Sequence, residues 1–379
     1  PKDCGRVRVK VIWPLKFVYN MSEGGATGVL DAMRGQWASM TGMAFMFVST
    51  ILIGLSVQPI YNIPEARAFG EEGASKGAFV ALELAMIGVF TIVIIWLARR
   101  GLEFFIKAIV LFALWMSLFY ALQPYVALIL YFLGLDTLFA VALLSIAISI
   151  GLIYLLHIFP EWYVVNGVGI MVGAGVITLI GVSFVPVLII GFMIAAAIYD
   201  YWAVNGSKHM LELADTMIDL KLPVLLVAPK NANYSFIEED DSVMRDKEIE
   251  ATKMDWEDPI PHIKNEEGAT KGRDALFMGL GDVIFPGMLV ISSVSFLPQT
   301  GGEVTYFSAF GVMYADSLTV AMGTLLGGLV GYFALMTQVA RGKPQAGLPL
   351  LNGGSILGYL ISGYFALGMS ALWQDITFF

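Results

Sequence analysis

Nine runs of about 20 predominantly apolar residues follow one another along this chain, and they exclude a water-soluble fold. Each run is long enough to cross the ~30 Å hydrocarbon core of a bilayer as a helix. The runs are continuous rather than alternating, which favours helices over the strands of a membrane barrel. We therefore expect an all-α polytopic membrane protein with about nine spans, at 40–58, 78–98, 104–133, 137–157, 164–181, 184–205, 276–297, 312–339 and 348–371.

The composition agrees with a membrane location and narrows the chemistry. Of the 379 residues, 58% are hydrophobic and only 14% are charged, which is more apolar surface than a soluble domain of this size can bury. Cys4 is the one cysteine, so a disulfide within the chain is excluded. The three histidines are scattered, which argues against a histidine metal site. We expect no metal, no organic cofactor and no nucleic-acid partner.

Basic residues predict the orientation of the spans. We divide the chain into an N-terminal cytoplasmic leader (1–38), spans one to six (39–205), a cytoplasmic loop (206–275) and spans seven to nine (276–379). With the N-terminus inside, only Arg67 and Lys76 of the 22 lysine and arginine residues fall on the outer side. This asymmetry follows the rule that basic residues gather on the cytoplasmic side.

The 206–275 loop has two different parts. Its first part, "KHMLELADTMIDLKLPVLLV" from Lys208, has apolar residues at helical spacing and predicts an amphipathic helix at the membrane surface. Its second part, 237–268, is acidic and poor in core-forming residues, which predicts a disordered tether. We hypothesise that the loop gates or recruits substrate.

Few ionisable residues lie within the spans, and such residues are costly in hydrocarbon and usually functional. Glu83, His157 and Asp316 lie near span ends, where a capping or interfacial role explains them. Asp200 lies eight residues before Lys208, and Asp282 lies eight residues after Asp274. At 1.5 Å per residue, both acids are ~12 Å from the same membrane side. The sequence thus predicts two carboxyl groups at one depth in neighbouring helices.

Two acids at one depth, with no lysine or arginine in either span, suit few arrangements. They can face each other and share a proton, as in aspartic proteases, where one carboxylate activates water and the other donates a proton. They can also relay protons or bind a cation in a transporter or channel. A scaffold with inert aspartates is a third reading. Gly279 and Gly281 would let another backbone approach Asp282, and Pro286 would weaken the helix beyond it.

The residues around these acids resemble the presenilin and signal peptide peptidase family of intramembrane aspartyl proteases. Tyr199-Asp200 in the sixth span and "GLGD" (279–282) in the seventh are similar to the two family signatures. "GLPLLNGG" (347–354) resembles the Pro-Ala-Leu motif of the last span, with leucine where the family usually has alanine. The resemblance spans roughly 340 residues in order and topology, and it is of the archaeal type.

The resemblance implies an endopeptidase that hydrolyses peptide bonds within transmembrane helices or signal peptides. Asp200 and Asp282 match the catalytic aspartates, and 271–276 match a segment that holds unwound substrate as an added strand. The expected partners are transmembrane-helix substrates and the lipid bilayer of a prokaryotic cell, with a possible homo-oligomer and no obligatory partner subunit. The proton- or cation-coupled transporter remains the alternative. The positions that match substrate-binding elements are Tyr199, Gly279, Leu280, Gly281, Leu348, Pro349, Leu350 and Leu351.

Overall fold

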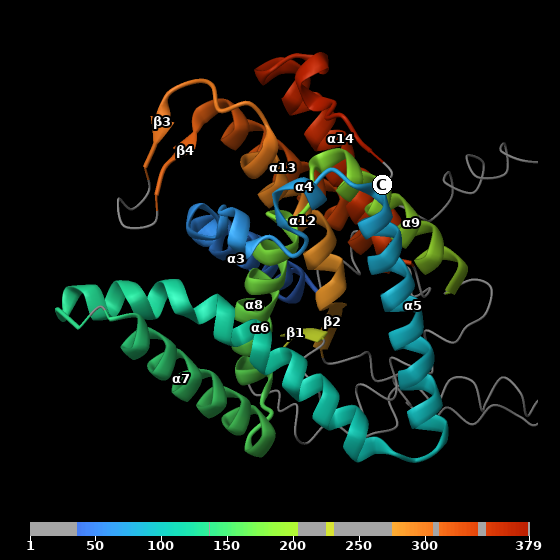
Figure 1. Cartoon of the computed structure of the whole chain (residues 1–379). Helices are drawn as coiled ribbons and strands as arrows, with labels where there is room; N and C mark the ends of the chain where they lie inside the picture. The colour runs from blue at the N-terminus through green and yellow to red at the C-terminus, as the bar shows by residue number, and fades with distance from the viewer. Residues whose placement is uncertain are drawn as a thin grey trace, which may run out of the picture.

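Nine long helices carry the fold in a computed structural model that describes residues 36–135, 137–203, 225–230, 275–305, 311–339 and 346–377 (Figure 1). They correspond one to one to the nine predicted spans. In chain order they are α3 (Trp37–Tyr61), α5 (Gly77–Arg99), α6 (Glu103–Phe132), α7 (Leu138–Ile158), α8 (Trp162–Gly181), α9 (Pro186–Trp202), α12 (Leu280–Phe296), α13 (Ala315–Val339) and α14 (Leu348–Ala366). The short helices η1 (Pro64–Ala66), α4 (Gly70–Gly73) and η3 (Met369–Leu372) lie between or after them.

The helix bounds differ from the predicted spans by up to five residues, and the largest difference is at the end of the ninth span, where α14 stops at Ala366 rather than at 371. α9 begins at Pro186 rather than at 184, because proline suits the first turn of a helix, where no N–H bond is lost. The predicted seventh span begins at 276, but 276–279 form the end of a strand and α12 begins only at Leu280. Gly279, with ψ 137°, is the extended residue at that junction. Pro124 lies inside the continuous helix α6.

Two small antiparallel sheets complete the fold and lie at opposite ends of α12 (Figure 1). β1 (Leu225–Pro229) pairs with β2 (Ala275–Gly279), with Val227 opposite Phe277. β3 (Glu303–Val304) pairs with β4 (Met313–Tyr314). The amphipathic helix predicted from Lys208 was wrong over 225–227, because these residues pair with β2 as a strand. The rest of that predicted helix, the leader 1–35, the acidic tether 237–268 and the segment 271–274 lie outside the described residues.

α12 is the central helix of the bundle. Its apolar residues face α3, α8 and α13 on one side and α9 and α14 on the other. Leu289, Val290 and Ile291 are fully buried, as expected for a helix that is apolar all round. The helix that carries Asp282 is therefore packed from several directions.

α13 and α14 approach each other closely along a seam of small residues. A side chain added at Gly327 would meet the backbone of Gly354 and Gly358, and one added at Gly331 would meet the backbone of Leu350 and Leu351. Small residues that let helix backbones touch are a common means of association in a bilayer, where apolar burial gives little drive between helices. The seam fixes the start of α14 against α13.

The outer helices present apolar side chains to the surroundings. Ile92 of α5, Phe112 of α6 and Phe139 of α7 are all more than half exposed. Six of the described helices are both long and apolar enough to cross a membrane, and α9 and α12 are shorter apolar helices of 10–17 residues. Such surfaces suit lipid, so the chain is an integral, multi-pass membrane protein.

We predict that Gly331→Ala lowers the melting temperature of the detergent-solubilised protein. Its added methyl group lies against the α14 backbone, with the Leu351 Cα only 3.1 Å away, and overpacking of this kind costs about 1–3 kcal/mol. The matched control is Gly88→Ala in α5, where nothing lies within 4 Å of the new methyl group. Gly88→Ala should leave the melting temperature unchanged or raise it, because alanine favours a helix over glycine. Equal shifts for both variants would contradict the seam.

Candidate active site

Asp200 lies in the last turn of α9 and points into the protein. Its side chain is only 6% exposed. Its Oδ2 atom accepts a hydrogen bond of 3.2 Å from the backbone N–H of Leu348, the first residue of α14. The first N–H groups of a helix have no partner within the helix, so this carboxyl group accepts from an N–H that has no acceptor within α14.

Asp282 lies in the first turn of α12, three residues after the end of β2. Its side chain is half-buried and accepts a hydrogen bond from the backbone of Gly279. It is also near enough to Asp200 for the two carboxyl groups to interact electrostatically. An acid in the first turn of a helix is favoured by the helix dipole, which helps to explain a carboxyl group at this depth.

Gly347 brings a third helix against the pair. A Cβ atom at this position would lie 3.2 Å from Oδ2 and 3.3 Å from Oδ1 of Asp282. The next residue, Leu348, donates to Asp200. Two consecutive residues at the start of α14 therefore lie against the two carboxyl groups: Leu348 donates to Asp200, and Gly347 leaves the space of a side chain beside Asp282. Gly347 is not among the site residues predicted from the sequence, and its signal there is its place directly before the Leu348-Pro349 pair.

The other predicted site residues on α9 and α12 lie around the pair in different environments. Tyr199 is 44% exposed and its ring packs near that of Trp202. Leu280 is buried against Gly173 of α8. Gly281 is exposed, with nothing within 4 Å of an added Cβ. Tyr199 and Gly281 thus face outward beside the acids, whereas Leu280 packs inward.

The four predicted residues of α14 fall into two groups with different surroundings. Leu348 binds Asp200 through its backbone, and Pro349 lines a cavity. Leu350 and Leu351 pack through their backbone against Gly331 of α13, and Leu351 is fully buried. The first two residues therefore belong to the surroundings of the acids, and the last two hold α14 in place.

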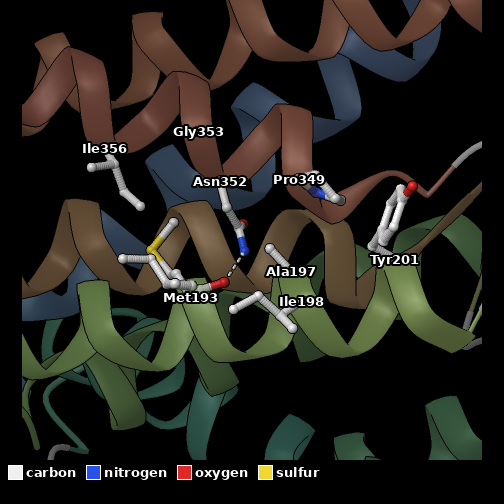
Figure 2. A pocket seen from close by; sticks show the side chains of 9 residues that line it. Met193, Ala197, Ile198, Tyr201, Pro349, Asn352, Gly353 and Ile356 are labelled. Carbon is white, nitrogen blue, oxygen red and sulfur yellow. Dashed lines mark hydrogen bonds between the residues drawn. The ribbon is translucent and has the colours of Figure 1, made fainter. Parts of the chain in front are cut away.

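A cavity of about 330 Å³ lies between α9 and α14, and Figure 2 shows the residues that line it. One wall carries Tyr201, the residue after Asp200, and the other carries Pro349, the residue after Leu348. Asn352 joins the two helices by donating a 2.9 Å hydrogen bond to the carbonyl of Met193, drawn as the dashed line in Figure 2. The remaining lining is apolar: Ile194, Ala197, Ile198, Gly353 and Ile356, with the side chain of Met193.

The remaining acids and the histidine lie outside this site. Asp316 is in the first turn of α13, at the β3–β4 end of the bundle, and His157 is in the last turn of α7. Glu83 is in α5, half-buried. Among the residues that the structure describes, no three histidine, cysteine, aspartate or glutamate side chains lie together as a metal site would need.

Two interacting carboxyl groups of this kind are equipped for acid–base chemistry. One can hold a proton while the other stays ionised, so that the pair can give and take a proton at a single reacting group. The exposed Gly281 and the neighbouring cavity leave room beside the pair.

Comparison with known proteins gives a consistent result. The sequence model of one family, described as signal-peptide peptidase and presenilin aspartyl protease, matches residues 43–368. Two solved structures of a presenilin family intramembrane aspartate protease, in space groups C222 and P2, are similar at 25% and 26% identity. Each match has a TM-score of 0.53 and covers 87% of this chain and 100% of the other. The comparison with curated proteins gave no match.

We predict that Gly347→Ala lowers kcat/KM for a cleavable substrate by about tenfold, or ~1.4 kcal/mol of transition-state stabilisation. Gly347 has helical φ and ψ values of −77° and −44°, so alanine fits the backbone and only the added methyl group beside Asp282 acts. Gly191→Ala in α9 is the control, because nothing lies within 4 Å of its new methyl group. Full activity in Gly347→Ala would refute the close approach of α14 to Asp282.

Proposed function

Because the chain belongs to the signal-peptide peptidase and presenilin family of aspartyl proteases, we propose that Asp200 and Asp282 are its catalytic pair. The protein is an intramembrane aspartyl protease, a hydrolase of peptide bonds. The observation that carries the assignment is the convergence of both carboxyl groups on residues 347–348 at the start of α14. The transporter alternative finds no support, because the matched family and structures are proteases.

The pair can hydrolyse a peptide bond with water alone. The ionised carboxylate takes a proton from water as the water oxygen attacks the scissile carbonyl carbon. The protonated carboxyl group gives its proton to the carbonyl oxygen, which forms a neutral tetrahedral intermediate. Collapse of that intermediate breaks the C–N bond: the first carboxyl group gives its proton to the leaving nitrogen, and the second carboxylate takes a proton from a hydroxyl group of the intermediate, so the pair returns to its starting state with one shared proton.

The substrate must unwind before this reaction can occur. A peptide bond within a transmembrane helix is shielded by its neighbours, and its freed N–H and C=O groups need partners in a site from which lipid cannot supply any. β2 ends three residues before Asp282 and is a strand at the correct place to supply such partners. We propose that the unwound segment lies along β2; the family resemblance implies this role for 271–276, of which Ala275 and Leu276 lie in β2.

The cavity between α9 and α14 offers a route for the substrate to reach the acids. Its lining is mostly apolar, and its walls end at Tyr201 and Pro349, the neighbours of Asp200 and Leu348. We propose that the substrate helix approaches from this side and that Pro349 contacts it. Tyr199 and Gly281, which are exposed beside the acids, are further contact residues in this proposal.

We also propose the setting in which the enzyme acts. The distribution of basic residues favours a cytoplasmic N-terminus and a cytoplasmic 206–275 loop, and the archaeal-type resemblance favours a prokaryotic cell membrane. The proposed partners are transmembrane-helix substrates and lipid, without an obligatory partner subunit, and a homo-oligomer is compatible with them.

We predict that Asp200→Asn and Asp282→Asn each lower cleavage of a reconstituted single-span peptide by at least about a hundredfold, the lower range for loss of a general acid or base. Asparagine preserves the shape and removes the acid. Asp316→Asn is the matched control, because Asp316 lies in the first turn of α13 near Gly301, at the other end of the bundle. Its activity should stay near that of the parent.

Three results would overturn the assignment. Wild-type cleavage that survives either replacement would exclude the pair as a catalytic unit. Equal losses in Asp316→Asn would point to damaged folding rather than lost chemistry. If the folded parent cleaves nothing but conducts ions, and this ion flux requires both acids, the transporter alternative would be favoured.

We predict that kcat/KM falls on both sides of a pH optimum, since the reaction needs one shared proton on the pair. On the acid side, a second proton removes the base. On the alkaline side, loss of the shared proton removes the acid. Initial rates measured across pH in liposomes, with circular dichroism as a check on folding, would test this. A rate that rises to a plateau with no alkaline fall would contradict the shared proton.

A further inference from the structure

An asparagine in a membrane helix binds the middle of β1 as if it were another strand. Asn166 of α8 donates from Nδ2 to the carbonyl of Val227 at 2.7 Å. The N–H of Val227 donates back to Oδ1 of Asn166 at 2.8 Å. The side-chain amide thus reproduces both hydrogen bonds that a neighbouring strand would form, and Asn166 is 6% exposed.

These two bonds show which edges of the sheet are occupied. Because both backbone groups of Val227 point to Asn166, the Val227–Phe277 pair is one whose members do not bond each other. The same alternation directs the backbone groups of Ala275 and Gly279 away from β1, on the side of β2 that leads to Asp282. The edge of β1 is closed at Val227 by a side chain, so a further strand cannot pair with β1 there.

A second helix holds the same edge of β1. Ser39 of α3 donates from Oγ to the carbonyl of Pro229 at 3.0 Å, two residues along from Val227. Leu226 and Val227 are fully buried, and Ala228 is 3% exposed. β1 is therefore fastened to α3 and α8, and its pairing with β2 connects that frame to α12.

The hydrogen bonds of Asn166 and Ser39 to β1 form a clamp that holds the sheet. Asp282 is three residues from the end of β2 in that sheet. Gly279 is both the last residue of β2 and the cap of α12, so no linker separates strand from helix. With the sheet held in place, the register in which a further segment pairs with β2 decides which of its peptide bonds reaches the acids. A slip of that register favours steps of two residues, because a one-residue slip turns every side chain to the opposite face.

We infer that Asn166 is a positioning residue that selects the peptide bond to be cut. This inference rests on the proposed function, and it adds a residue from α8 to the site. Asn166 closes the edge of β1 and sets the sheet against α8, so that an unwound substrate pairs with β2 in one register and presents one bond to Asp200 and Asp282. Loss of the clamp lets the register slip and spreads cleavage over neighbouring bonds.

The test is to map cleavage sites in Asn166→Leu, which removes both hydrogen bonds at similar size. Thr178→Val is the matched control: Thr178 is buried in the same helix, and its hydroxyl donates to the carbonyls of Gly54 in α3 and Ala174 in α8. A single-span peptide is cut by each reconstituted enzyme and the products are weighed by mass spectrometry. We expect Asn166→Leu to increase products cut two residues from the main site, while Thr178→Val keeps the parent pattern.

A disulfide provides a rescue that a purely structural role would not show. Pro229 and Ala275 face each other in a pair of the same type as Val227–Phe277, in which Cα atoms lie about 4.5 Å apart and a disulfide fits. Pro229→Cys with Ala275→Cys, in a Cys4→Ser background, locks β1 to β2. In Asn166→Leu that also carries this disulfide, cleavage should return to the main site when the disulfide is formed. It should spread to neighbouring bonds again when the disulfide is reduced.

The outcomes separate this inference from the proposed function. If Asn166→Leu cuts the main site with the parent's product pattern, the inference is overturned and the catalytic pair stands. If the parent cleaves nothing, the proposed function fails first. Should Asn166→Leu fail to fold, Asn166→Ser replaces it, because serine keeps one polar group beside Val227. A pattern in Asn166→Ser that remains that of the parent, with or without the lock, also overturns the inference.

Discussion

The structure depends on one requirement: two carboxyl groups within an apolar bundle need polar partners close at hand. The partners are backbone groups at chain positions where a helix begins. Leu348 gives Asp200 an N–H that α14 leaves open, and Gly279, at the cap of α12, gives one to Asp282. Both carboxyl groups thus have a backbone hydrogen-bond donor and do not depend on water or a lysine side chain for one. The helix starts thus do for the acids what solvent does at a protein surface.

That requirement explains why the surrounding helices pack as they do. α14 can bring Gly347 and Leu348 to the acids only if its start is held in place, and the small-residue seam with α13 provides the hold. α12 can bring Asp282 only if its start is fixed, and β2 provides that by pairing with β1. The chemistry and the packing are therefore set by the same few residues.

The nine helices and the proximity of Asp200 to Asp282 were accessible from the sequence, because apolar runs and a matched depth of two acids are local, countable signals. The strand at Leu225–Pro229 was not, since its leucines also fit helical spacing and only its partner β2 decides. Gly347 and Asn166 were missed for a related reason. Neither residue is charged: Gly347 matters because it has no side chain beside Asp282, and Asn166 because its amide forms hydrogen bonds with β1.

The seam between α13 and α14 has a consequence for how deep the acids sit. α13 begins at the β3–β4 hairpin, where the N–H of Ala315 donates to the carbonyl of Gly302. From there a rigid helix pair runs the length of the bundle to Gly347. The length of this helix pair sets the distance between the β3–β4 sheet and the acids, so the depth of the acids is fixed relative to the membrane surface on that side. In a thicker bilayer a substrate helix anchored at the opposite surface would be read at a different position along its length.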